Sequence, residues 1–209
     1  MKQLLLLTDS GHGGLVKKGD NLVYTTGLKK RYVHADGSEA LEGVINRKAE
    51  SNLVKQWDSE GRAWVDVSSG NLDIPLRTRV KLANNLNVDY RDKYNLVYLS
   101  MHSNAGKGTG IEVFTSKGQT RSDELAEICI QELNTEFPDI AMRKDASDGD
   151  SDKEEDFYVL RNTRMPAILV EFLFFDNADD WKLLQSDSML WRYSYALYKS
   201  LRIIEEAWK

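Results

Sequence analysis

Histidines and a carboxylate stand where three apolar runs of the sequence end, and these residue types bind metal ions and transfer protons. They are His12 after Leu4–Thr8, His102 after Asn95–Ser100, and Glu171 directly after Ala167–Val170. In a parallel α/β sheet, ligands bind outside the carboxyl ends of the strands. We therefore expect these three side chains to meet at one edge of a sheet.

The inventory of metal-binding residue types narrows the kind of site. The chain has three histidines and one cysteine, so a zinc site built from several thiolates is excluded. Two histidines and one carboxylate match a catalytic zinc site, which keeps an open position for water. Composition leaves the third ligand open among Glu39, Glu42 and Glu50. We expect His34 to be a loop histidine without a metal role and Cys129 to be a buried apolar residue.

Glu171 stands between four apolar residues and the apolar Phe172–Phe175. A carboxylate in such a setting is costly to bury unless it is paired, bound to a metal or protonated. The alternative to a functional role is a salt-bridged acid in the core.

The elements that must position these residues alternate between strands and helices. Strands are predicted at 4–8, 63–67, 95–100, 111–115, 157–160 and 167–172, and helices at 46–57, from Pro75 onward, at 123–136 and within 177–208. This alternation predicts an α/β fold, a three-layer sandwich with a mostly parallel mixed sheet flanked by helices on both faces. Since no Pro/Ser-rich linker is visible, we expect one catalytic domain over residues 1–209.

Two long polar segments interrupt this alternation. Residues 13–41 are predicted to hold a hairpin that pairs 22–24 with 32–33. The second segment is crowded with acidic residues: Asp145, Asp148, Asp150, Asp152, Glu154, Glu155 and Asp156. We interpret it as a solvated loop; a calcium loop is the alternative, although the full alternating-ligand pattern ending in a bidentate glutamate is absent.

Charge and hydropathy exclude several classes of protein. The formal net charge is -5 and no long basic run occurs, which argues against a nucleic-acid partner. The apolar run after Lys2 is too short for a signal peptide and no small-residue cleavage site follows. No stretch approaches 18 apolar residues, so no membrane insertion is expected. We expect synthesis in the cytoplasm without a signal peptide.

Six motifs occur in the order found in a known enzyme family. They are DSGHGG at 9–14, EGVIN at 42–46, LRTRVKLAN at 76–84, SMHSN at 100–104, GIEVF at 110–114 and YVLRNTRMPAILVEFLFFDN at 158–177. In type and order they resemble the zinc-dependent N-acetylmuramoyl-L-alanine amidases of the amidase-3 type. The resemblance covers nearly the whole chain, and the six motifs together are far more specific than any one of them.

The resemblance implies a site for one Zn²⁺ per chain. Matched by position, the zinc ligands are His12, Glu42 and His102, and the catalytic glutamate is Glu171; Glu50 is the alternative third ligand. The sequence departs from the family at Ser10, where proline is commoner, and at Phe172-Leu173, where glycine is usual. The second departure is expected to change the wall of the pocket.

The chemistry expected of such a site is hydrolysis of an amide. Zinc polarises the carbonyl and makes a water nucleophilic near neutral pH, and Glu171 passes the proton of that water to the leaving amine. Asp9 is expected either to orient His12 or to cap its own turn. Arg161 and Asn104 are the expected substrate contacts, with the planar fork of Arg161 suited to a carboxylate of the stem peptide.

By resemblance, the substrate is peptidoglycan and the bond cleaved joins the lactyl group of N-acetylmuramic acid to L-alanine. The expected role is that of a monomeric phage or prophage endolysin that acts on the cell wall after release and causes bacteriolysis. The alternatives are a zinc peptidase or deacylase that acts on another amide, and a non-catalytic glycan-binding module.

Overall fold

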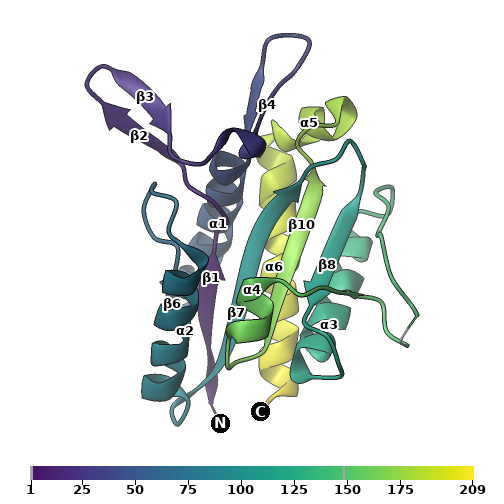
Figure 1. The fold of residues 1–209 in the computed structure, drawn as a ribbon. Coiled ribbons are helices and arrows are strands. Elements are labelled where there is room, and N and C mark those ends of the chain that lie inside the picture. The colour runs from purple at the N-terminus through teal and green to yellow at the C-terminus, as the bar shows by residue number, and fades with distance from the viewer. Residues whose placement is uncertain (1, 148) are drawn as a thin grey trace.

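The computed structural model describes residues 2–147 and 149–209, together with all their side chains except that of Leu28. Its centre is a six-stranded sheet with the strand order β6-β1-β7-β10-β8-β9, seen in Figure 1. The strands are β1 (Gln3–Asp9), β6 (Trp64–Asp66), β7 (Tyr94–Asn104), β8 (Ile111–Thr115), β9 (Lys153–Glu154) and β10 (Ala167–Phe174). All neighbours pair in parallel except β8 and β10, so the sheet is mixed and mostly parallel.

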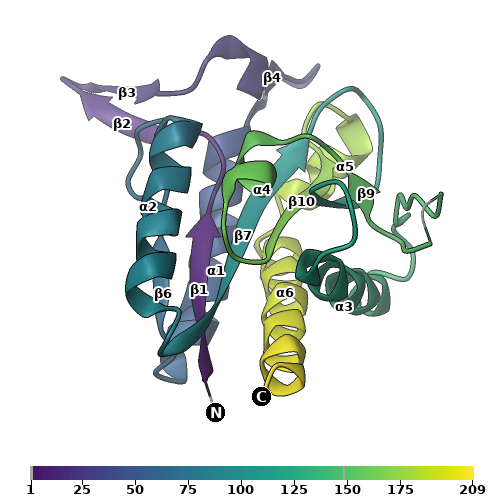
Figure 2. The same ribbon diagram turned by 60° about the horizontal axis from the view of Figure 1, so that its bottom comes forward.

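Helices cover both faces of this sheet (Figures 1 and 2). They are α1 (Glu42–Ser59), α2 (Leu76–Tyr90), α3 (Arg121–Glu136), α4 (Tyr158–Asn162), α5 (Ala178–Leu184) and α6 (Asp187–Ala207). One hydrophobic cluster joins the sheet to α1, α3 and α6, and a second joins the opposite face to α2 and α4. The predicted three-layer α/β class is confirmed. Among the described residues, no helix has the length and apolar character needed to cross a bilayer.

Strand β1 shows how the sequence specifies this arrangement. Leu4 and Leu6 pack on the α1/α3/α6 face, and Leu5 and Leu7 pack on the α2/α4 face. Side chains of a strand alternate between the two faces, so a strand that is covered on both sides needs a continuous apolar run. The leucine run therefore places β1 in the middle of the sheet and Asp9 at its carboxyl end.

The prediction of a strand at 157–160 is wrong, because the short helix α4 occupies that region. Val159 and Leu160 are adjacent and both pack on the same face of the sheet, which a helical turn allows and an alternating strand does not. A run of four apolar residues does not distinguish these two cases by periodicity.

The long segment after β1 forms two hairpins in place of the single predicted one. Strand β2 (Leu15–Lys18) pairs with β3 (Asn21–Tyr24), and β4 (Arg31–Val33) pairs with β5 (Glu39–Leu41). A short 3₁₀ turn, Leu28–Lys30, separates the hairpins. They lie above the carboxyl ends of the central strands (Figure 1) and deliver the chain to the start of α1.

Candidate active site

The first histidine is presented by a tight turn after β1. Gly11 has φ +36°, and a Cβ atom at this position would lie 2.3 Å from Cε1 of His102. His12 itself adopts φ +64°, a left-handed conformation that is strained for a residue with a side chain. Glycine at position 11 therefore allows the turn to approach β7 closely enough for the two imidazoles to meet.

Glu42 is the first residue of α1, and its side chain is fully buried. The next residue, Gly43, lies against the turn that carries His12: a Cβ atom on Gly43 would stand 1.7 Å from the carbonyl oxygen of Gly13. The Gly43 amide also donates to the hydroxyl of Tyr24, over 2.9 Å. This close packing fixes the start of α1, and with it the Glu42 carboxylate, beside the β1 turn.

His12, Glu42 and His102 form one compact group of donor atoms. Oε1 of Glu42 lies 2.9 Å from Nδ1 of His102 and 3.2 Å from Nε2 of His12. The two imidazole rings are 5.0 Å apart and nearly perpendicular. The structure thus brings together the two histidines singled out in the sequence and joins them to one of the three candidate glutamates.

The other two candidate glutamates lie elsewhere. Glu39 is exposed and paired with Arg31. Glu50 is buried about two turns further along α1, where it faces the hydroxyls of Thr8 and Ser10 and the carboxylate of Asp66. Burial and the Asp66 charge raise the pKa of Glu50 to about 7.

This donor set fits a zinc ion. Zinc bonds of about 2.0–2.1 Å place neighbouring ligand atoms roughly 3.3 Å apart, close to the two separations around Glu42. Nε2 of His12 is shielded from solvent and has no hydrogen-bond partner among the described residues. A buried ring nitrogen without a partner next to a second imidazole and a carboxylate is what a metal ligand requires.

The charges around this group favour an ionised Glu42. Burial by itself would raise the pKa of Glu42, but the neighbouring imidazoles of His102 and His12 outweigh it and hold the pKa well below its usual range. Burial lowers the pKa of His12. Lys30 contributes a further cation, with Nζ 2.9 Å from Oε2 of Glu42.

Glu171 lies beside this group. In the sheet register it is paired with His102 of β7, so the two side chains stand on the same face of adjacent strands. Its Oε2 atom is shielded and without a hydrogen-bond partner among the described residues. Burial first, and then the Glu42 charge, raise the pKa of Glu171 to about 8. A carboxyl group in this condition is suited to gaining and losing a proton near neutral pH.

A pocket of about 350 Å³ opens in front of the two histidines. Its other wall comes from the segment that leads into α2, which includes Asp73, Ile74, Pro75 and the half-exposed Leu76. The donor group is therefore accessible to a ligand.

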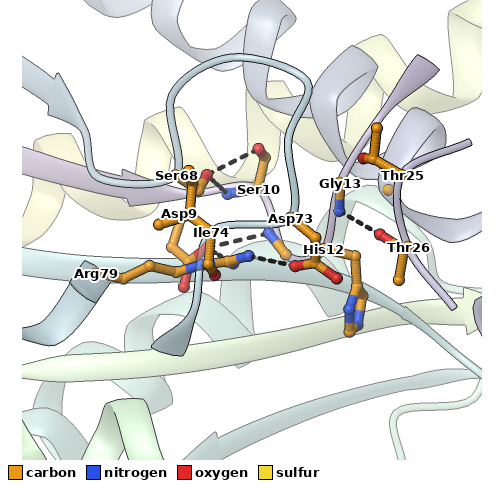
Figure 3. A network of polar contacts seen from close by, with 12 residues as sticks. Asp9, Ser10, His12, Gly13, Thr25, Thr26, Ser68, Asp73, Ile74 and Arg79 are labelled. Carbon is orange, nitrogen blue, oxygen red and sulfur yellow. Dashed lines mark hydrogen bonds and ion pairs between the residues drawn. The ribbon is translucent and has the colours of Figure 1, made fainter. Parts of the chain in front are cut away.

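Asp9 has a different partner from the one considered in the sequence. Its carboxylate accepts from Arg79 (2.5 Å), Tyr98 (2.6 Å) and Ser100 (3.3 Å), and from the amide of Gly11 (3.2 Å). Among the described residues it makes no hydrogen bond to His12, and Figure 3 shows its ion pair directed toward Arg79 instead. Of the two expected roles, capping the β1 turn is the one present in the structure.

The two expected substrate contacts are both engaged within the protein. Arg161 is exposed on α4 and pairs with Asp156 over 2.5 Å. Asn104 ends β7, where its side-chain amide donates to Glu112 over 2.5 Å. Their contact with the substrate stays a prediction.

The departure from the family at Leu173 falls in the core. Leu173 has φ +62°, a conformation that glycine adopts without strain, and it follows an irregularity in the pairing of β10 with β7. Its side chain is fully buried in the cluster under α1, α3 and α6. Leu173 therefore does not change the pocket wall, contrary to the expectation. The burial of its apolar side chain offsets the strain of its backbone.

The remaining histidine and the cysteine have structural surroundings. His34 is 8% exposed, stacks on Trp181 with ring centroids 5.2 Å apart, and contacts the carbonyl of Phe175 through Nε2 at 2.9 Å. Cys129 is fully buried on α3, and burial raises the pKa of its thiol to about 12.

The acidic segment is partly built into the sheet. Residues 153–154 form the edge strand β9, which the sequence did not predict. Asp150 and Asp152 come close to Asp123 of α3, and the oxygens of these three carboxylates could share a cation. Asp148, another member of the acidic set, lies outside the described residues.

Three residues near the site were missed in the sequence. Lys30 pairs with Glu42, Arg79 pairs with Asp9, and Glu112 is paired in register with Glu171. Arg79 and Glu112 lie inside motifs that were recognised, which was the available signal. Lys30 lies in the polar segment between two hairpins, and nothing in its local pattern marks it.

A family model for N-acetylmuramoyl-L-alanine amidases of the amidase-3 type matches residues 7–202. The chain belongs to this family. The fold agrees with solved members: the amidase AmiC2 of Nostoc punctiforme (TM-score 0.75, 21% identity, 97% of each chain) and an N-acetylmuramoyl-L-alanine amidase from Clostridium difficile 630 (TM-score 0.76, 21% identity, 99% of each chain).

Two relatives have similar sequences. The N-acetylmuramoyl-L-alanine amidase CwlM of Bacillus licheniformis is 26% identical over 88% of this chain and 62% of its own length. The endolysin of Bacillus phage SPP1 is 27% identical over 89% of this chain and 60% of its own length. The chain therefore spans about three fifths of the curated relatives that it matches.

Proposed function

We propose that this protein is a zinc-dependent peptidoglycan hydrolase that cleaves the amide between the lactyl group of N-acetylmuramic acid and L-alanine. The observation that carries the proposal is the position of Glu171, with its shielded and unpartnered carboxyl oxygen, next to the His12/Glu42/His102 group. Membership of the amidase family supports the choice of amide.

His12, Glu42 and His102 would hold the zinc ion, which supplies Lewis-acid activation of the carbonyl and of a water molecule. The protein's own contribution is to keep these ligands fixed, with Glu42 ionised and His12 neutral. Buried surroundings lower the pKa of His12, and Lys30 compensates part of the Glu42 charge. Glu171 takes a proton from the attacking water and gives it to the leaving nitrogen. Its pKa of about 8 without zinc will fall when a cation binds nearby, toward the range of a general base.

We further propose that residues 1–209 form one catalytic domain, active as a monomer, whose biological role is of the endolysin type. The similarity to the phage SPP1 endolysin supports this role, and the intact set of four site residues argues against a purely glycan-binding module. Lysis of bacteria with permeabilised membranes by the added protein tests the role, and size-exclusion chromatography with light scattering tests the monomer.

The decisive experiment is digestion of purified peptidoglycan with the zinc-loaded protein, followed by mass spectrometry of the products. The proposal expects free lactyl carboxylates on the glycan and new L-alanine amino termini. The Glu171→Gln protein is the matched control and should release neither. Cleavage only within peptides, or of N-acetyl groups, would assign the protein to the peptidases or deacylases instead.

A further inference from the structure

A line of acidic and basic side chains crosses the sheet from the proposed metal ligands to its far edge. Glu171 of β10 is paired with His102 of β7 on one side and with Glu112 of β8 on the other. Residues in register point to the same face, so these three side chains stand in a row. Two strand spacings place Glu112 roughly 10 Å from His102.

Glu112 is buried, with 4% of its surface exposed, and it forms ion pairs with two cationic side chains. Its Oε1 atom lies 2.8 Å from Nε of Arg143 and 2.6 Å from Nζ of Lys153, and Oε2 accepts from Asn104. Burial alone would raise the pKa of Glu112, but Lys153 and Arg143 outweigh it and keep the pKa below its usual value. The group of Glu112, Arg143 and Lys153 therefore carries one net positive charge.

Arg143 and Lys153 keep donors for a further partner. Glu112 engages the Nε atom of Arg143, and among residues 2–147 and 149–209 the terminal nitrogens of this guanidinium have no hydrogen bond. The Arg143 side chain is 43% exposed and that of Lys153 is 29% exposed. The guanidinium carbon lies 5.4 Å from the ring centre of Phe174, so Glu112 and Phe174 fix its orientation while its terminal fork remains accessible.

The chemistry of these donors indicates a carboxylate ligand. A guanidinium fork binds a planar carboxylate through two parallel hydrogen bonds, and a neighbouring ammonium group adds charge. On the amide proposed as substrate, carboxylates belong to the peptide, beyond L-alanine, and not to the glycan chain. The sequence singled out Arg161 for the same kind of contact, and Arg161 stays a separate prediction.

We propose that Arg143 and Lys153, held in place by Glu112, bind a carboxylate of the stem peptide and so direct the peptide along the β10–β8 side of the site. This assignment rests on the proposed function. It makes Arg143 and Lys153 specificity-determining residues and Glu112 a positioning residue for both.

The test compares two synthetic muramoyl peptides that differ in one group. In the first, the residue after L-alanine has a free carboxylate; in the second, that carboxylate is amidated. The zinc-loaded wild-type protein should cleave the first with the higher kcat/KM. Arg143→Ala should lower kcat/KM for the first peptide by about ten- to a hundred-fold, mainly through KM, because a charge-assisted hydrogen bond is lost. The second peptide should be nearly unaffected.

Lys153→Ala should have the same selectivity with a smaller loss, and Arg143→Lys should be intermediate because it retains charge without the fork. Lys81→Ala is the matched control, since it removes an exposed cation from α2, and it should leave both peptides unchanged. Circular dichroism melts identify variants that lose stability. Equal losses on both peptides, or a wild-type protein indifferent to amidation, would overturn the assignment.

A binding measurement separates this assignment from the proposed function. Calorimetry with the zinc-loaded Glu171→Gln protein should show tighter binding of the carboxylated peptide, and Arg143→Ala in that background should remove the difference. This binding result can be interpreted even if the wild-type protein cleaves neither peptide. In that case the proposed function fails and the assignment of the carboxylate subsite still stands. Equal affinity for both peptides in the parent protein contradicts the subsite.

Discussion

Arg79 and Asp9 form an ion pair in which both side chains are 1% exposed, with Nη1 of Arg79 and Oδ1 of Asp9 2.5 Å apart. The same guanidinium reaches Asp73 at 3.1 Å and the carbonyl of Ile74 at 2.7 Å (Figure 3). Arg79 therefore connects the turn that carries His12 to the loop that forms the opposite wall of the pocket. The role of Arg79 is therefore structural: it stabilises the turn that carries His12 and the opposite wall of the pocket together.

Arg79→Ala should be strongly destabilising, because it leaves the Asp9 charge buried without its partner. Breaking a buried ion pair in this way costs about 3–5 kcal/mol, and urea denaturation measures the loss. Arg77→Ala, on the exposed face of the same helix, is the control and should change the free energy of unfolding by less than about 0.5 kcal/mol. Similar values for the two variants would show that the pair contributes little.

Glu171→Gln should retain the fold and the zinc content and lose turnover. General acid–base catalysis contributes about 10²–10⁴-fold to the rate, so kcat should fall by that factor while zinc, measured by atomic emission, remains at one per chain. A variant that keeps more than a tenth of the wild-type kcat would assign the proton transfer to another group.

Glu42→Ala should weaken zinc binding far more than Glu50→Ala. Glu42 lies between the two histidines, whereas Glu50 faces Asp66 and two hydroxyls. We expect a loss of affinity of at least about a hundred-fold for Glu42→Ala, since even groups that only support a ligand contribute 10- to 100-fold. Competition with a chromophoric chelator measures both variants, and the reverse order would move the third ligand to Glu50.

Gly43→Ala should disturb the site through the backbone. The added methyl group would stand 1.7 Å from the carbonyl oxygen of Gly13, whereas at Gly27 it would meet no atom within 4 Å. We expect Gly43→Ala to lower the melting temperature and the zinc affinity together, and Gly27→Ala to change neither. Thermal melts with and without zinc report both effects. An unperturbed Gly43→Ala protein would show that α1 shifts freely at its start.

Asp152 should make the stability of the protein depend on pH. Burial, and then the neighbouring Asp150 and Asp123, raise the pKa of Asp152 to about 7 in the folded state, against an ordinary value of 3.8. The folded protein thus binds more protons than the unfolded chain between these values, and stability is lost as the pH rises from about 4 to about 7. Asp152→Asn removes this loss.

Melting temperatures of the Asp152→Asn and wild-type proteins at pH 5 and pH 8 check this prediction. From pH 5 to pH 8, the melting temperature of the variant should rise relative to that of the wild-type protein. Each kcal/mol of added stability corresponds to about 2–4 °C. Asp139→Asn, at an exposed position, is the control. If the melting temperatures of Asp152→Asn and wild type differ by the same amount at both pH values, the predicted pH dependence is contradicted.

The sequence by itself determined the residue types of the site and the edge of the sheet at which they gather. Apolar runs such as Leu4–Leu7 must be buried on both faces, and this requirement predicts that the turn of His12 and the neighbourhood of His102 lie at the carboxyl ends of buried parallel strands. The motif order also singled out Glu42 and Glu171. Burial and strand periodicity are local properties, so they are readable from a window of a few residues.

Only the tertiary structure decided which side chains meet. Glu39, Glu42 and Glu50 are equivalent ligands in composition, and packing of Gly43 against the β1 turn brings Glu42 to the histidines. Asp9 pairs with Arg79 and Glu112 gathers Arg143 and Lys153 across separations of 70, 31 and 41 residues. Such contacts depend on how whole elements pack, which no local pattern of the chain encodes.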